Sequence, residues 1–474
     1  MSAIPADIET DAQPPMAIPL RHFLVGLAFL LAGTFLGTLS PLGVLPGATG
    51  LAHVHLLLVG WVCITIMGAM TQFVPVWSGT ALHSRRLSTI QLWTVTGGLA
   101  GFVLCLLGGF YGVLPAFGVL ILAGFWVFVY NVGRTLLGVR PWDVTERHFA
   151  VALGFFLLVT FFGLLLAVGY ARPLFVESPL TRSALRSSHA TLAVFGAVLT
   201  TVFGALYQLG TMFTQTELHG VDIHLRRIEE LGYPFGVAAL AGGRLFADPT
   251  VARIGGLLVL AGVGAMGLVL GRRLVETAVA WNPMLRRYAV AAGAMVGWAL
   301  VTLPVWLSST LDPTATFGSP AGTHLLLLGA VGFVVAGTLY HVVPFIVWVH
   351  RYSDRLGLEA VPMIDDLYDD RLARIDFAAM GIGAALLVGS ESAQVLRIGA
   401  PTVGSDSTLL VLGGAASVAG VAVLAANLAM TIRRHGDRSL FSIGTAGDGS
   451  ARDPVAGDSR TADSSAGSPP EEFD

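Results

Sequence analysis

Residues 53 to 79, HVHLLLVGWVCITIMGAMTQFVPVWSG, form a long apolar run that begins with two histidines, His53 and His55. A run of this length is sufficient to cross a membrane as a helix. Imidazole is costly in hydrocarbon unless it has a partner, so a histidine there indicates a functional site. Successive helix positions turn by about 100°, so the two rings point about 200° apart. They predict two separate centres, although a single histidine near a helix end could instead bond a carbonyl at the lipid boundary.

The pattern of this run returns twice later in the chain. Two glycines follow His55 at five and thirteen residues, and the same offsets hold from Thr191 and from His324. His189 precedes Thr191 by two residues, as His53 precedes His55. The matching glycines are Gly60 and Gly68, Gly196 and Gly204, and Gly329 and Gly337. The three starting points lie about 135 residues apart, which predicts three related units. Such glycines allow the close approach of either a neighbouring helix or a flat macrocycle.

The composition predicts an integral membrane protein. Of its 474 residues, 54% are hydrophobic and only 12% are charged, and the mean hydropathy is +0.74. These values are typical of an integral membrane protein surrounded by lipid and give no indication of nucleic-acid binding. Cys63 and Cys105 lie in apolar runs without a C-x-x-C motif, so we interpret both as packing residues.

Twelve apolar runs predict an all-α integral membrane domain over residues 18–433. The predicted spans lie near 20–42, 51–77, 88–110, 112–138, 147–170, 186–213, 230–247, 250–271, 286–308, 321–347, 374–398 and 407–432. They divide into three pseudo-symmetric repeats of four helices, about 18–140, 141–275 and 276–433, with the histidine helix second in each. The polar flanks 1–17 and 434–474, the second of them acidic, are expected to be disordered.

The starts of the units repeat as well. Arg21-His22-Phe23, Arg147-His148-Phe149 and Arg286-Arg287-Tyr288 open the first, fifth and ninth spans. We interpret these basic residues as anchors at the membrane interface. Glu391, near the end of the eleventh span, is the clearest acid that we find inside a span.

The distribution of arginine predicts the orientation of the chain. Arginines concentrate in the loops after the even-numbered spans, which places both termini in the cytoplasm of a multi-pass plasma-membrane protein. The loop after the fifth span, with Arg172, Arg182 and Arg186, goes against this trend. The histidine helices then begin at the outer face, so that four histidines should lie at one depth, as a metal or haem layer requires. These candidate ligands are His53, His55, His189 and His324.

The H-V-H pair, the glycine thirteen residues on and the exit Pro75, Ser78 and Gly79 resemble the tenth helix of the haem-copper oxidase catalytic subunit I superfamily. The cbb3-type oxidases and nitric oxide reductases are the most similar members, and they too have twelve helices in three pseudo-symmetric groups. The resemblance implies that His53 binds a high-spin haem and His55 a low-spin haem. Here the pair lies in the first unit, which is more similar to the haem- and copper-containing membrane proteins of the nitrosative-stress response.

One departure from the family concerns copper. The oxidases bind copper partly through an adjacent His-His pair, and this sequence contains none. Four-electron oxygen reduction is therefore in doubt, and whether the chain is an oxidoreductase that turns over or a protein that only binds a gas stays open. The expected cofactors are one or two b-type haems, with one copper as an option.

Two pairings of the histidines are compatible with the sequence. His55 and His324 share one register in their units, which favours a pair. If the units are instead a rotated version of the oxidase order, His55 pairs with His189 across a low-spin haem, and His53 faces His324 across a second centre. We favour the second scheme slightly.

The resulting hypothesis is a haem-binding, oxidase-like membrane protein that handles electrons and a diatomic gas, NO or O₂, near the outer face. An electron-donor cytochrome or cupredoxin at that face would be its partner. The alternatives are a solute or haem transporter with a histidine-lined path and a non-catalytic subunit with the oxidase fold.

Overall fold

The computed structural model describes residues 14–176, 180–396 and 405–436, and within these ranges no strand is present. Eleven of the helices are long and apolar enough to cross a membrane, which confirms an all-α, multi-pass membrane protein. The predicted disordered segments, 1–17 and 434–474, lie almost wholly outside the described residues.

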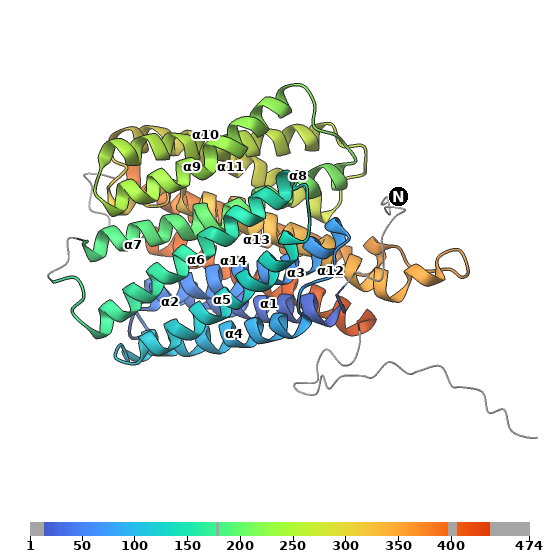
Figure 1. The fold of residues 1–474 in the computed structure, drawn as a ribbon, viewed down its shortest axis with the longest axis horizontal. Helices are drawn as coiled ribbons and strands as arrows, with labels where there is room; N and C mark the ends of the chain where they lie inside the picture. The colour runs from blue at the N-terminus through green and yellow to red at the C-terminus, as the bar shows by residue number, and fades with distance from the viewer. Residues whose placement is uncertain (1–13, 177–179, 397–404, 437–474) are drawn as a thin grey trace, which may run out of the picture.

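Most helices follow one another with short connections, and the longer ones are 309–324 and 352–369 (Figure 1). In chain order they are α1 Ala17–Leu39, α2 Thr49–His55, η3 Leu56–Cys63, α3 Ile64–Ser78, α4 Arg85–Gly108, α5 Leu114–Leu137, α6 Val144–Ala171, α7 Arg182–Thr191, η4 Leu192–Leu199, α8 Thr200–Thr214, α9 Val221–Leu245, α10 Pro249–Val275, α11 Pro283–Ser308, η7 Leu325–Gly332, α12 Phe333–Arg351, α13 Asp370–Leu396 and α14 Ser405–His435. Single 3₁₀ turns lie at Ser40–Leu42, Pro313–Ala315, Pro320–Gly322, Ser353–Arg355 and Ile364–Asp366.

The seventh predicted span corresponds to α9, which begins at Val221 rather than near residue 230. This helix is not among the eleven that are apolar enough to cross a membrane, because it carries several charged side chains. Asp222, Glu229 and Arg244 on α9 are nevertheless buried, and α9 packs along α10. We therefore expect α9 to be shielded from lipid by protein on its polar side.

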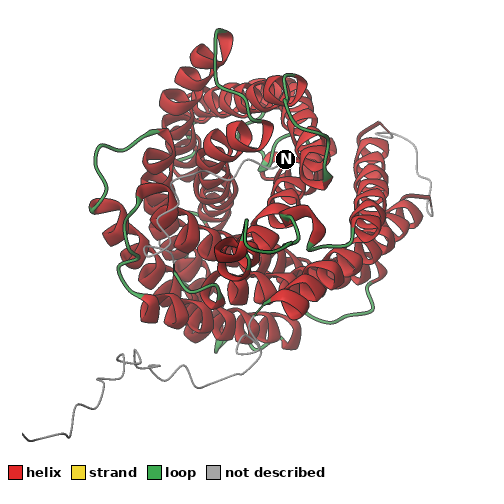
Figure 2. Cartoon of the chain, turned by 90° about the vertical axis from the view of Figure 1, so that its right-hand side faces the viewer, coloured by secondary structure: helices red, strands yellow, loops and turns green. Residues whose placement is uncertain are grey.

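The long helices form a ring that closes on itself (Figure 2). Helix α5 packs on α6, α10 packs on α11, and α14 returns to pack on α1. Three composite helices, each bearing candidate histidines, lie inside this ring: α2–η3–α3, α7–η4–α8 and η7–α12. Of their most apolar stretches, 67%, 83% and 78% is buried, against 22–61% for the other spanning helices. Their inner position agrees with the prediction of three inner histidine helices.

Each inner helix contains an eight-residue π-helical segment. These segments, η3, η4 and η7, begin one residue after His55, Thr191 and His324, so they occupy equal offsets in the three predicted units. A π segment shifts hydrogen bonds from i→i−4 to i→i−5 and is common at functional sites. The regular turn of about 100° per residue therefore does not hold beyond the histidines.

The basic residues at the starts of the units are only partly interfacial, so our interpretation of them as anchors was wrong for the middle residue of each triplet. His22, His148 and Arg287 are 1%, 3% and 0% exposed. Each of these side chains lies against the second glycine of the repeated pattern on the neighbouring inner helix. A Cβ added to that glycine would lie 2.6–3.1 Å from the buried side chain. Those glycines, Gly68, Gly204 and Gly337, therefore serve helix packing rather than the approach of a macrocycle.

Two acids inside the helices are more deeply buried than Glu391, the acid that the sequence analysis singled out. Asp376 on α13 and Glu229 on α9 are both fully buried, while the Glu391 side chain is 13% exposed. Each of the two buried carboxylates faces one of the buried basic residues, Arg287 or His148. Paired charges of this kind hold helices together and are costly to break.

Candidate functional site

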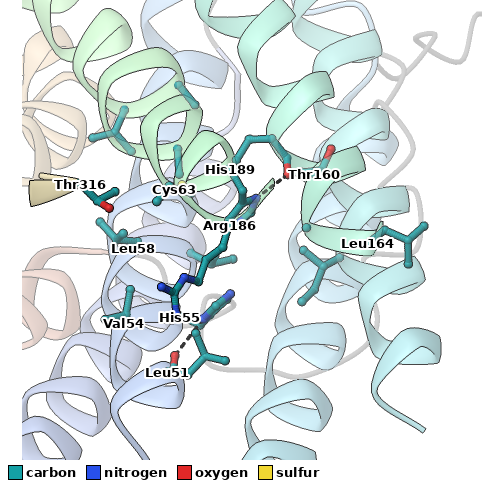
Figure 3. Close-up of a pocket in the computed structure, with 18 of the residues that line it drawn as sticks. Leu51, Val54, His55, Leu58, Cys63, Thr160, Leu164, Arg186, His189 and Thr316 are labelled. Atoms are coloured by element: carbon teal, nitrogen blue, oxygen red, sulfur yellow. Dashed lines mark hydrogen bonds between the residues drawn. The ribbon is translucent and has the colours of Figure 1, made fainter. Parts of the chain in front are cut away.

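His55 and His189 line the same cavity, which lies between two of the inner helices and three outer ones. The cavity has a volume of about 360 Å³, within the range of small-molecule sites. Its walls are mostly apolar and come from α2–η3, α4, α5, α6 and α7–η4, and the loop 313–317 closes one side. Figure 3 shows both imidazoles at this cavity, with Leu58 and Cys63 on the wall.

The two rings are held in a defined orientation by backbone carbonyls. His55 Nδ1 lies 2.8 Å from the carbonyl of Leu51, and His189 Nδ1 lies 3.0 Å from that of Val159 on α6. Because a carbonyl oxygen only accepts, each Nδ1 must carry the proton, which leaves the Nε2 lone pair free. Neither Nε2 is hydrogen-bonded to any part of the chain that the structure describes. This arrangement is typical of a histidine that binds a metal through Nε2.

His55 and His189 are close enough to interact electrostatically. The Phe102 ring lies 5.0 Å from the His55 ring and contributes to the same wall. Gly163 on α6 lies beside His189, where an added Cβ would stand 3.0 Å from the ring. The structure thus brings together one of the two histidine pairs that the sequence left open.

His53 and His324 are also close enough to interact electrostatically. His53 Nδ1 donates to the carbonyl of Gly33 on α1 at 2.7 Å. His324 Nδ1 donates to the Glu391 carboxylate at 2.7 Å, and the His324 backbone N–H donates to the other carboxylate oxygen at 3.1 Å. Both Nε2 atoms are again without a hydrogen bond to a described residue. A carboxylate behind an imidazole raises its basicity and fixes its orientation, which favours metal binding.

One arginine lines the cavity and a second holds its closing loop, although sequence reasoning gave neither a role there. Arg186 lines the cavity and makes no hydrogen bond or ion pair with the residues that the structure describes; Figure 3 shows its side chain near His55. Arg244 is 3% exposed and donates to Thr191 Oγ1 at 2.6 Å and to the carbonyl of Thr316 at 2.9 Å. Arg244 thereby ties the His189 helix to the loop that closes the cavity.

The closing loop is also fixed by its own cap. Asp312 accepts hydrogen bonds from the hydroxyl and the backbone N–H of Thr314, at 2.7 and 2.8 Å. These bonds hold the pKa of Asp312 below its usual value of 3.8, because they stabilise the carboxylate. Thr314 itself lines the cavity, so the ionised Asp312 helps to keep this wall in place.

The candidate ligands come in pairs rather than in larger sets. Within the described ranges, no group of three or more His, Cys, Asp or Glu side chains is placed to hold a metal ion. Two imidazoles on opposite sides of a flat metal complex, however, need only two protein ligands. The carbonyls of Gly33 and Val159 were missed from the sequence because a backbone acceptor leaves no trace in residue identity.

No model of a known protein family matches the chain, and no curated protein is significantly similar to it.

Proposed function

We propose that the chain is a haem-binding membrane protein that holds one haem between His55 and His189. The observation that supports this most is the convergence of two Nε2 lone pairs on one apolar cavity. Most buried polar atoms in proteins are hydrogen-bonded, and an imidazole without a partner is costly in hydrocarbon. Here each ring has one nitrogen fixed by the backbone and the other left available.

The surroundings of the cavity suit a porphyrin. Apolar side chains from several helices would cover its faces, and Arg186 offers an unpaired cation for the carboxylates that a b-type haem carries. A haem with two histidine ligands is coordinatively saturated and carries electrons. His55 and His189 would hold it and set its orientation, while the apolar walls would keep water from the iron.

The second pair, His53 and His324 with Glu391 behind it, is our proposed site for a second centre, either another haem or a copper ion. A haem with a single histidine ligand leaves one face open for NO or O₂. A three-imidazole copper site has no support in the described residues, as the absence of an adjacent His-His pair in the sequence also suggests.

We further propose three related four-helix units and membership of the haem-copper oxidase superfamily. Three parallels support the repeat: the equal offsets of η3, η4 and η7, the buried residue beside each inner glycine, and the carbonyls of Gly33 and Val159, which bond His53 and His189 from matching turns of α1 and α6. The orientation with both termini in the cytoplasm, the plasma-membrane location and an electron donor at the outer face belong to the same proposal. The role would be respiratory or in nitrosative stress.

A reduced-minus-oxidised optical spectrum of the purified chain, with haem quantified as its pyridine complex, tests the central proposal. We expect bands of a low-spin b-type haem that disappear in His55→Ala and His189→Ala and persist in His83→Ala, a control in an exposed loop. Protein from haem-replete cells without haem bands would contradict the proposal, as would bands that survive both substitutions.

Carbon monoxide separates the two centres. If the second centre is a haem with an open face, CO added to the reduced protein shifts its spectrum, and His55→Ala leaves most of that shift intact. Loss of CO binding in His55→Ala with retention of the low-spin bands would reverse the roles that we give to the two pairs.

A further inference from the structure

A buried cluster of His148, Glu229 and Tyr207 lies apart from the four candidate ligands. His148 Nε2 lies 3.0 and 3.2 Å from the two carboxylate oxygens of Glu229, and the Tyr207 hydroxyl donates to Glu229 at 2.8 Å. The side chains of His148 and Glu229 are 2% and 0% exposed. The three residues come from α6, α9 and α8, so the cluster joins three helices.

The hydrogen bonds require one proton between His148 and Glu229. His148 Nδ1 lies 2.7 Å from the carbonyl of Val144, so this nitrogen must be the donor. The contact between Nε2 and the carboxylate is a hydrogen bond only if a proton is present, on the imidazole or on the carboxyl group. Without that proton, two lone pairs would face each other in a buried place, at a substantial energetic cost.

The chain contains a permanently charged counterpart of this cluster. Arg287 on α11 is paired with Asp376, and the Tyr340 hydroxyl donates to the same carboxylate. His148 and Arg287 lie against the corresponding glycines of their inner helices, Gly204 and Gly337. A guanidinium does not release its proton in proteins, whereas an imidazole does so near neutral pH. The basic residue is thus permanently charged in the Arg287 cluster, whereas the imidazole of the His148 cluster can release its proton.

The residues next to the buried pair along the chain reach the protein surface. Arg147 and Glu230, the chain neighbours of His148 and Glu229, form an ion pair at 2.6 Å with side chains 48% and 19% exposed. The charged and titratable groups that face the cluster are Tyr207 on α8, Arg147 on α6, and Arg226, Glu230 and Tyr233 on α9. The Arg147–Glu230 pair is thus the exposed ion pair that adjoins the buried one along both helices.

On its inner side the cluster is linked to the helix that carries His189. Tyr233 lies one turn beyond Glu229 on α9 and donates to the carbonyl of Phe195 at 2.7 Å. Phe195 belongs to η4, the π segment that begins three residues after His189. A change in the charge of the cluster would therefore act on a segment whose backbone hydrogen bonds are already irregular.

We propose that His148, Glu229 and Tyr207 form a proton-binding site that exchanges one proton with water beside the Arg147–Glu230 pair. The Arg287 cluster is its counterpart, in which the base keeps its proton. This proposal does not depend on haem, because neither cluster contains a candidate ligand.

Infrared difference spectra of the full chain in detergent, recorded between acidic and alkaline pH, test the site directly. We expect a carboxyl or imidazole signal that titrates in the wild type, is lost in Glu229→Gln and in His148→Gln, and is unchanged in Asp376→Asn. Arg287→His should add a second titrating signal. A wild-type spectrum without such a signal, or one whose signal survives Glu229→Gln, would overturn the proposal.

Access to the site is tested by the rate of deuterium exchange at the same signal. We expect Arg147→Ala to accelerate exchange several-fold. Arg374→Ala, which removes an exposed pair with Asp370 on α13, should leave the rate unchanged. Equal rates in the wild type and Arg147→Ala would refute the route past this pair. Haem spectra of these variants remain those of the wild type if only the proton site is affected.

Discussion

The Arg287–Asp376 pair allows a sharp test of how the helices are held together. Both side chains are fully buried, and Asp376 accepts hydrogen bonds from Arg287 and Tyr340. In Asp376→Asn the shape is kept but the negative charge is removed. Loss of one partner from a buried ion pair costs about 3–5 kcal/mol, because the remaining charge is left uncompensated.

Arg287 keeps other partners in this variant, which reduces the expected loss. Its guanidinium still donates to the carbonyls of Pro283 and Ala373, at 2.7 and 3.0 Å, and lies 4.5 Å from the Tyr340 ring. We therefore expect about 3 kcal/mol, at the lower end of the range for buried pairs. Since 1.4 kcal/mol is a factor of ten, the unfolding equilibrium should change on the order of a hundredfold.

The measurement is the free energy of unfolding by SDS in mixed micelles. Asp370→Asn on the same helix removes an exposed pair with Arg374 and should cost no more than about 0.5 kcal/mol. The double variant Arg287→Met/Asp376→Leu should cost less than Asp376→Asn, since it leaves no buried charge behind. A loss below about 1 kcal/mol in Asp376→Asn, or one matching the exposed control, would refute this reasoning.

Three further outcomes follow from the site. Glu391→Gln should weaken metal or haem binding at the His53–His324 pair by about 10- to 100-fold in a ligand titration and leave the low-spin bands intact; unchanged affinity would contradict the role of Glu391. The hydrogen bonds of the Asp312 cap lower the pKa of that carboxyl. The stabilisation that the cap gives to the loop is therefore complete above pH 3.8, the ordinary pKa, and is lost as the pH falls through the lowered pKa. Hydrogen-exchange protection of the loop 313–317 should therefore fall below about pH 4 in the wild type and be low at every pH in Asp312→Ala, which has no acceptor. Arg244→Lys keeps the charge but cannot reach the same set of acceptors, so the same loop should lose protection at neutral pH, and full protection would show that the charge alone matters.

The long helices and their histidines were predictable because apolar length is written directly in the sequence. The span carrying His53 and His55 was expected at 51–77, and the corresponding helix runs over Thr49–Ser78. Helix α9 was placed less well, since its first two turns are polar and give no hydrophobic signal. What such a helix buries depends on its neighbours, and those are set by contacts far apart in the chain.

The pairing of the histidines could not be decided from the sequence. It depends on how the inner helices are ordered within the ring, which is a property of packing between distant segments. Sequence register favoured His55 with His324, while the rotated arrangement favoured His55 with His189. In the structure His55 and His189 are close enough to interact electrostatically, and so are His53 and His324.

The buried basic residues show a different limit. Arg287 and Arg286 are adjacent and chemically identical, yet Arg287 is fully buried and Arg286 is exposed. A cation at a helix start has the same appearance in sequence whether it faces headgroups or the protein interior. The signal that could have identified Arg287 is the combination of a facing glycine, Gly337, with an acid on a third helix, Asp376.

The π segments are selected by packing rather than by the local sequence. Residues such as Leu56–Cys63 would form a regular α-helix by propensity, so the wider turn must be selected by packing. In the first two units a phenylalanine of the preceding helix packs against the glycine inside the π segment. Phe29 contacts Gly60 and Phe155 contacts Gly196, and a Cβ added to either glycine would lie only 2.6–2.9 Å from the ring. In the third unit Ala294 of α11 takes this place against Gly329, at 3.0 Å from an added Cβ, so close packing on the glycine rather than an aromatic ring is what the three segments share. The residues just before the segments, His55, Thr191 and His324, are therefore oriented by this packing and not by helix propensity alone.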